Sequence, residues 1–405
     1  MPTSTPNQRP LLLRNRNFAY VWLGQVLSQG GSKAYLINLI WWIVVNAKDE
    51  SQAATQSGIL LILTAMPGIL FAIPIGHLIS RFSSKALLVI GEFCAALLVA
   101  AIWLLLQANQ LNFPVLCALS FAIACCQAVV DPTLTHATVQ LVAAEDVEGA
   151  VGLEASTQSM AYFIGTGLGA SLTGMFGLSA ALFLNIASYV ISACATLLAH
   201  FQKMAAAQDH GSAAQNAGDF RAMGVHTLLY CFAAANFFMF PVFLVLPIFT
   251  KNVLQQGVAQ LGMLEACFWL GLISGAFASK YVFKQLPVHQ TSGRLMLLFG
   301  TFLAAILVLP NLYFTGLALF VGGSAAGIIN VKVISYFQRV VPDHAKGHFF
   351  AKLQGFITSA QPLGYCAFTF FLANLDSSKA FAAQGLGLCL VGMICLLAAG
   401  GSKVK

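Results

Sequence analysis

The two halves of this 405-residue chain repeat each other at an offset of 199 residues. The segment Gly76-His77-Leu78-Ile79-Ser80-Arg81 returns as Gly275-Ala276-Phe277-Ala278-Ser279-Lys280, and Asp131 returns as Asn330. Both halves are almost wholly apolar and are broken only by short polar segments. A long apolar repeat of this kind is typical of membrane transporters built from two homologous bundles. The repeat therefore predicts two copies of one helical bundle.

The composition excludes a water-soluble protein. Hydrophobic residues make up 59% of the chain and charged residues 8%, whereas a soluble domain carries roughly 25% charged residues. A membrane-spanning helix needs about 20 mostly apolar residues. Twelve stretches satisfy this: 18–46, 58–80, 86–107, 113–141, 150–173, 178–202, 222–250, 259–283, 293–310, 312–339, 349–373 and 378–400. We therefore expect an all-α polytopic membrane protein with twelve transmembrane helices in two six-helix bundles.

The longest polar break separates the two halves. Residues 203–221 are rich in Ala, Gln, Asp, Gly and Ser, a composition typical of a flexible linker. The sequence therefore predicts an N-terminal bundle over 1–202, a cytoplasmic linker over 203–221 and a C-terminal bundle over 222–405.

Basic residues indicate how the chain is oriented in the membrane. The net charge is +7, and most of the 20 Lys and Arg fall in loops on one side of the predicted spans. An excess of Lys and Arg marks cytoplasmic loops, so we expect both termini in the cytoplasm. This distribution explains the positive charge without a nucleic-acid partner.

No pattern in the sequence indicates an enzyme, a cofactor or a metal site. The ten cysteines fall almost entirely inside the predicted spans and have no metal-ligand spacing. No Gly-x-x-x-x-Gly-Lys-Ser/Thr loop is present for binding a nucleotide phosphate. A polytopic membrane enzyme would need a catalytic cluster that we do not find.

The loop after the second predicted span carries a recognisable motif. Gly76-His77-Leu78-Ile79-Ser80-Arg81-Phe82-Ser83-Ser84-Lys85 resembles the Gly-x-Leu-x-Asp-Arg-x-Gly-Arg-Lys pattern of the major facilitator superfamily. The resemblance implies a secondary transporter that works by alternating access in the cytoplasmic (inner) membrane of a bacterium. It also implies that Gly76, Arg81 and Lys85 form a gating motif, in which Ser80 replaces the family's aspartate.

Other segments resemble one group within that superfamily, the enterobactin-type siderophore exporters and macrolide efflux pumps. They are Asn15-Arg16-Asn17-Phe18, Trp22-Leu23-Gly24-Gln25, Val341-Pro342-Asp343 and Gln361-Pro362-Leu363-Gly364. The resemblance implies a proton-coupled exporter of a small amphipathic molecule such as a siderophore, working as a monomer with protons and the lipid bilayer as its other partners. The alternatives are an importer of a nutrient or metal-chelate, and a hydrophobic drug or macrolide efflux pump.

Polar residues form stripes along several predicted helices. Residues three or four apart share a helix face, as Gln25, Gln29 and Lys33 do in the first span. In the superfamily, helices one, four, seven and ten line the central cavity. The substrate-cavity candidates are therefore Gln25, Gln29, Lys33, Gln127, Asp131, Asn236, Lys332 and Ser335.

Asp131 and Lys33 are the first candidates for proton coupling. A carboxylate beside an ammonium stays ionised, and withdrawing the ammonium favours protonation. Alternating access could supply that change; the alternative is a structural ion pair between helices one and four. Glu154 and Glu265 are further candidates. Lys332 could attract an anionic or metal-chelating substrate, pair with Asp131 or Glu265, or extend to the membrane surface.

Two other titratable residues are expected to be structural. Glu92 lies about two helical turns from Lys85, so we expect it to pair with Arg81 or Lys85 at the inner surface. His136 is turned away from the face of Asp131, and we expect it to be packed and hydrogen-bonded.

Overall fold

The computed structural model describes residues 10–143, 146–201, 225–283 and 285–401. The predicted linker, 203–221, lies outside these residues. The sixteen helices found in the described residues are α1 (Leu11–Arg14), α2 (Arg16–Asn46), α3 (Glu50–Ala65), α4 (Pro67–Leu70), α5 (Ala72–Arg81), α6 (Ser84–Gln107), α7 (Phe113–Leu141), α8 (Val147–Phe176), α9 (Leu178–Leu198), α10 (His226–Met239), α11 (Val242–Asn252), α12 (Val258–Ala278), α13 (Val288–Ala305), α14 (Leu312–Val340), α15 (Asp343–Leu372) and α16 (Ser377–Gly401).

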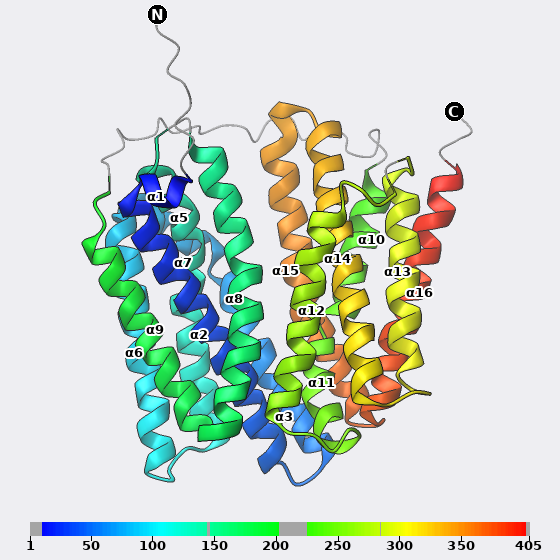
Figure 1. Ribbon diagram of the computed structural model, residues 1–405, viewed down its shortest axis with the longest axis horizontal. Helices are drawn as coiled ribbons and strands as arrows, with labels where there is room; N and C mark the ends of the chain where they lie inside the picture. Colours follow the sequence, from blue (N-terminus) through cyan, green and yellow to red (C-terminus); the bar gives the residue numbers. More distant parts are fainter. Residues whose placement is uncertain (1–9, 144–145, 202–224, 284, 402–405) are drawn as a thin grey trace, which may run out of the picture.

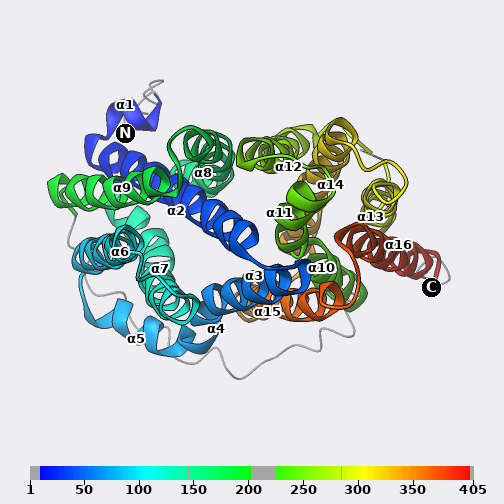
Figure 2. The same cartoon turned by 90° about the horizontal axis from the view of Figure 1, so that it is seen from below.

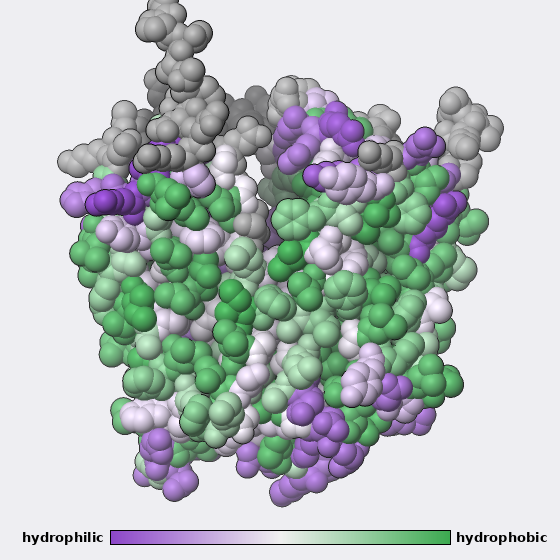
Figure 3. Space-filling view, viewed as in Figure 1, coloured by the Kyte–Doolittle hydropathy of each residue, from purple (hydrophilic) through white to green (hydrophobic). Residues whose placement is uncertain are grey.

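The observed helices confirm the all-α polytopic fold. Within the described residues, eight helical segments are long and apolar enough to cross a membrane by themselves. The space-filling view shows apolar side chains covering the middle of the molecule, with hydrophilic residues gathered at both ends (Figure 3). This distribution is what a lipid bilayer around the middle of the protein requires.

The repeat appears in the structure as matching helices. The bounds of α14 are those of α7 shifted by 199 residues, and each helix has 29 residues. Both begin with an asparagine cap: the Asn112 side chain accepts a hydrogen bond from Val115 N, and Asn311 accepts one from Phe314 N. Asparagine caps a helix because its side-chain oxygen satisfies an otherwise free backbone N–H.

Prolines divide two of the predicted spans. The span expected over 58–80 is split into α3, α4 and α5, with Pro67 as the first residue of α4. The span expected over 222–250 is likewise split between α10 and α11 just before Pro241. Proline has no backbone N–H and crowds the preceding turn, so it interrupts the helical hydrogen bonds.

The helices form two groups, one from α1 to α9 and the other from α10 to α16 (Figure 1). The groups meet along two seams, where α8 packs against α12 and α3 packs against α15. From below, α2 and α11 approach each other between these seams (Figure 2). The two groups thus surround a common central region.

The two ends of this central region differ. We call the end that carries α1 and the last turn of α16 the terminal end, and the other end the closed end (Figure 1). At the terminal end, the space-filling view shows a hollow between the two groups of helices (Figure 3).

Hydrogen bonds join the two groups at the closed end. Lys251 Nζ in α11 donates to Val44 O, 2.7 Å away, in the last turn of α2. The backbone N–H of Ser377, at the start of α16, donates to Glu50 Oε1 at 2.8 Å. The two groups of helices are therefore separated by a hollow at the terminal end and joined by hydrogen bonds at the closed end.

Candidate functional site

Lys33 lies near the middle of α2 and faces the boundary between the two groups of helices. Its Nζ is 4.0 Å from the ring centroid of Tyr162 in α8. The charge of Lys33 acts on two carboxyl groups, Asp131 in α7 and Glu265 in α12. Since α12 belongs to the second group, this one ammonium interacts with acids of both halves of the molecule.

Asp131 is an exposed side chain in the interior of a long helix. The charges of Lys33 and Glu154, from α2 and α8, act on its carboxyl group. Because Lys33 also acts on Glu265 in the other group of helices, Asp131 faces the boundary between the groups and not the lipid. Its exposure is therefore to the space between the two groups of helices.

Glu265 is a buried acid with only 7% of its surface exposed. Within the described part of the chain, its carboxyl group has no hydrogen bond and no ion pair. A buried carboxylate without a partner costs several kcal/mol. A titratable group in such an environment is a candidate for proton uptake or for binding a positive ligand.

Aromatic rings complete this region along the α8–α12 seam. Tyr162 meets Trp269 of α12 edge to face, with ring centroids 4.7 Å apart. Trp269 in turn stacks on Phe243 of α11 at 5.5 Å. We call Lys33, Asp131, Tyr162, Glu265 and Trp269 the boundary cluster.

The sequence analysis had named Lys33, Asp131 and Glu265 as candidates but had not named Tyr162 or Trp269. It also missed Tyr365 in α15, whose hydroxyl accepts a hydrogen bond from Gln361 Nε2 at 3.4 Å. The charge of Glu265 acts on Tyr365. The sequence did contain a signal for Tyr365. Gln361 and Tyr365 are one helical turn apart, and Gln158 and Tyr162 in α8 have the same spacing and also share a hydrogen bond.

The expected contact between Lys33 and Asp131 is not a direct ion pair in this structure. Among the described residues, Lys33 contacts the face of Tyr162 and comes within 4.0 Å of no carboxylate oxygen. The two residues interact at longer range, through their charges. Lys33 is therefore free to approach either acid without first breaking a salt bridge.

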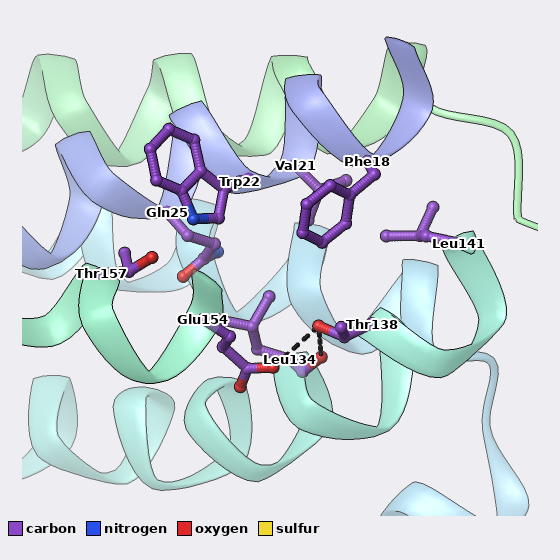
Figure 4. Close-up of a pocket in the computed structure, with 9 residues that line it drawn as sticks. All are labelled: Phe18, Val21, Trp22, Gln25, Leu134, Thr138, Leu141, Glu154 and Thr157. Carbon is purple, nitrogen blue, oxygen red and sulfur yellow. Dashed lines mark hydrogen bonds between the residues drawn. The ribbon is translucent and has the colours of Figure 1, made fainter. Parts of the chain in front are cut away.

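Glu154 lies outside the boundary cluster, on the wall of a small pocket between α2, α7 and α8 (Figure 4). Its carboxylate accepts hydrogen bonds from Thr135 Oγ1 at 2.7 Å and from Thr138 Oγ1 at 2.9 Å. Trp22 and Gln25 line the same pocket. Glu154 thus has fixed neutral partners, which distinguishes it from Glu265.

The expected pairing of Glu92 with Arg81 or Lys85 is wrong. Glu92 is 0% exposed, and its carboxylate accepts hydrogen bonds from Gln25 Nε2 at 2.9 Å and from Ser28 Oγ at 3.0 Å. Ser192 in α9 also donates to it, at 3.2 Å. Glu92 therefore points into the bundle, because α2 and α9 supply donors that its own helix cannot.

Lys85 bonds to the end of α9 and not to Glu92. Its Nζ donates to Leu197 O at 2.7 Å and to Ala199 O at 2.8 Å, at the C-terminal end of α9. A cation at this position is stabilised by the negative end of the helix dipole. The other gating residues, Gly76 and Arg81, lie exposed on α5 at the terminal end. Ser80 donates to the backbone oxygen of His77 at 2.9 Å.

The remaining cavity candidates are scattered. Gln29 and Gln127 each bury one amide atom that has no hydrogen-bond partner among the described residues. Asn236 is buried and donates to Phe232 O within α10. Lys332 Nζ donates to Phe283 O at 3.1 Å, in the segment that follows α12.

Two further candidates have structural neighbours. Ser335 is half-buried in α14, and its carbonyl oxygen accepts a hydrogen bond from Arg339. His136 is hydrogen-bonded to Ser84 Oγ at 3.1 Å and to Gln140. The hydrogen bonds expected for His136 are therefore present, but its side chain is exposed and not packed as expected.

Comparison with known proteins identifies the fold. The family model described as Major Facilitator Superfamily matches residues 21–369. No curated protein matches the sequence. The crystal structure of a bacterial homologue of the human lysosomal transporter Spinster, inward-facing and occupied, has a TM-score of 0.73 and 13% identity, covering 98% of each chain.

A second solved structure is available in two conformations. The inward-facing state of a bacterial homologue of the iron transporter ferroportin gives a TM-score of 0.75 and 13% identity, covering 95% of this chain and 98% of that one. Its outward-facing state gives 0.57 and 13% identity, covering 95% and 100%. The present structure is thus more similar in shape to the inward-facing state.

Proposed function

The chain belongs to the major facilitator superfamily and is a secondary transporter of small molecules that works by alternating access, and on that premise we propose that it exports a small amphipathic molecule in exchange for protons. Its place is the cytoplasmic membrane of a bacterium, with both termini in the cytoplasm. The terminal end then faces the cytoplasm, and the structure corresponds to an inward-facing state.

The boundary cluster is the observation that carries the proposal. It places two acids from opposite bundles, Asp131 and Glu265, within the electrostatic influence of one ammonium, Lys33. Rearrangement of the bundles changes the distances between these groups, and a carboxyl group that loses a positive neighbour binds a proton more tightly. Proton binding is thereby linked to the conformational state.

The cargo is proposed from the resemblance to the siderophore-exporter and macrolide-efflux group. A siderophore is the first candidate, and a hydrophobic drug is the second. Import of a metal-chelate by the same fold is the competing direction, because a fold of this kind does not determine the direction of transport.

The first experiment compares small molecules in the medium of cells with and without the gene, grown with scarce iron. Export predicts that one molecule disappears from the medium and accumulates in cells that lack the protein. An unchanged medium, together with poorer uptake of a supplied metal-chelate, would instead establish import.

The second experiment tests the role of Asp131. Asp131→Asn preserves the size of the side chain but removes the carboxyl group that binds and releases a proton. We therefore expect export driven by a pH gradient to be lost while the protein remains folded in the membrane. Asp49→Asn is the matched control, because asparagine can still cap α3 at the membrane surface. Undiminished export by the Asp131 variant would exclude this residue from proton coupling.

A further inference from the structure

The boundary cluster contains more negative than positive groups. When ionised, Asp131 and Glu265 carry two negative charges, and Lys33 carries one positive charge. Within the described residues, Lys33 is the one cation whose charge acts on both carboxyl groups. Buried charges in proteins are retained when they are paired. The ionised cluster therefore lacks one positive charge.

We infer that the boundary cluster binds the cationic group of the transported molecule, an organic cation with an aromatic or apolar body. The inference rests on the proposed function, since it names the class of molecule carried at the same site. It also opposes the expectation of an anionic cargo. An anion bound here would face two carboxylates.

Glu265 is the group that most needs such a partner. It is 7% exposed, and within the described residues it has neither a hydrogen bond nor an ion pair. The neighbouring acid Glu154 has two threonine donors, and Glu92 has three donors from α2 and α9. Among the described residues, Glu265 is thus the buried acid of these three that has no donor or cation in contact with it.

Lys33 already occupies the face of the Tyr162 ring, where a cation can bind. Its ammonium lies 4.0 Å from the ring centroid of Tyr162, and such a contact contributes about 0.5–2 kcal/mol. No salt bridge fixes it among the described residues. Because it is tethered to α2 by a flexible side chain, Lys33 can withdraw when another cation arrives. We regard Lys33 as an occupant of the Tyr162 face that a substrate cation displaces toward Asp131, so that each of the two carboxylates then has one positive neighbour.

The aromatic residues provide the surface for the remainder of the molecule. Trp269 lies between Tyr162 and Phe243, edge to face with the first and stacked on the second. Its indole N–H is buried without a hydrogen-bond partner among the described residues. A ligand that offers an acceptor here would satisfy this donor.

Lys332 does not provide an anion site at this cluster. Its ammonium donates to Phe283 O, after α12, and its charge is not among those acting on Asp131 or Glu265. In the part of the chain that the structure describes, Lys33 is therefore the cation whose charge reaches both acids of the boundary cluster.

Two probes of nearly the same shape and opposite charge test the inference. Tetraphenylphosphonium is a cation and tetraphenylborate is an anion, so their difference reports the preferred charge and not the apolar area. Binding to the purified full-length protein is measured by equilibrium dialysis in detergent, with protein-free detergent subtracted. We expect saturable binding of the cation and no saturable binding of the anion.

The variants sharpen the test. Glu265→Gln should weaken binding of the cation about tenfold or more, the equivalent of about 1.4 kcal/mol. Lys33→Ala should strengthen it several-fold, because the competing ammonium is gone. Asp49→Asn is the control, a carboxyl group at the start of α3 outside the cluster, and should leave the affinity unchanged. A single symmetrical elution peak confirms that each variant is folded.

Two binding results would overturn the inference. Saturable binding of tetraphenylborate that is lost in Lys33→Ala would show an anion site. Weaker binding of tetraphenylphosphonium in Lys33→Ala would show that Lys33 supports the ligand and is not displaced by it.

Failure of the inference and failure of the proposed function are distinguishable, because binding needs no proton gradient. Transport is measured separately in proteoliposomes. If tetraphenylphosphonium binds as expected but no pH gradient drives it, proton coupling fails and the cation site stands. If a pH gradient drives the natural cargo while the cation does not bind, the inference fails and the proposed function stands.

Discussion

At the scale of single residues, Glu92 shows how a carboxyl group is accommodated inside an apolar bundle. It lies between α6, α2 and α9 and is surrounded by side-chain donors, with no cation in contact with it among the described residues. The donors are themselves removed from water, and Gln25 Nε2 also donates to Ser192 Oγ at 3.2 Å, so the carboxyl group and its donors form one network. The network therefore fixes the packing of three helices.

Removing the acceptor should destabilise the bundle. Glu92→Ala leaves Ser28 Oγ without its acceptor and Gln25 Nε2 with Ser192 Oγ alone. An unsatisfied buried group costs about 1–3 kcal/mol. We expect a clear fall in the thermal unfolding midpoint in detergent. Glu92→Gln retains the volume and one acceptor oxygen, so its effect should be much smaller. Equal midpoints for the two variants would show that these hydrogen bonds do not stabilise the fold.

The sequence could not predict this arrangement. Glu92 and Lys85 are seven residues apart on one helix, and helical spacing alone suggested that they would meet. The actual partners of Glu92 lie 67 and 64 positions earlier in the chain and 100 positions later. Periodicity identifies the residues that share a face of one helix, but it does not identify which other helix covers that face. The same limit explains why Trp269 was missed.

At the scale of helices, the closed end is joined by charges placed at helix ends. Lys251 of α11 donates to the last turn of α2, and Glu50 accepts from the first N–H of α16. A helix carries partial negative charge at its C-terminus and partial positive charge at its N-terminus. In both contacts a charged side chain thus lies at the helix end of opposite partial charge, and both contacts connect one bundle to the other.

Neutralising these charges should open the closed end more often. We expect Lys251→Met and Glu50→Gln each to shift the balance by about 0.3–2 kcal/mol, the usual strength of a charge at a helix terminus. Spin labels at Gln110 and Leu309, on loops of the two bundles, would report longer distances. The exposed neighbour Lys48→Met is the control. Variants that match the control would show that these bonds do not hold the end closed.

Helices were the level that the sequence predicted best. The bounds expected for the fourth span, 113–141, are those of α7, because an asparagine cap and an apolar run determine them locally. The divisions at Pro67 and Pro241 were not expected. A proline in an apolar run either kinks a helix or breaks it, and the outcome depends on which neighbours satisfy the exposed carbonyl groups.

At the scale of the whole molecule, alternating access requires the two ends to close in turn, so we expect contacts at both ends to set the balance between the two states. The family's gating motif is expected to stabilise the state in which the terminal end is shut. In this open structure Ser80 is bonded to its own helix, and Arg81 is exposed. An added Cβ at Gly76 would meet no atom within 4 Å. The motif residues thus have room to make further contacts.

Restoring the family's aspartate should favour closure of the terminal end. Ser80→Asp adds a negative charge that can pair with a helix N-terminus or a basic side chain, which is worth up to about 1 kcal/mol at an exposed site, or about fivefold in population. Spin labels at His200 and Lys280 lie at this end on opposite bundles, so their distance distribution should move toward shorter values. Ser80→Asn is nearly the same size without the charge and should leave the distribution unchanged. If the aspartate and asparagine variants give the same distances, the missing charge does not set the conformational balance, and the loop acts through its backbone alone.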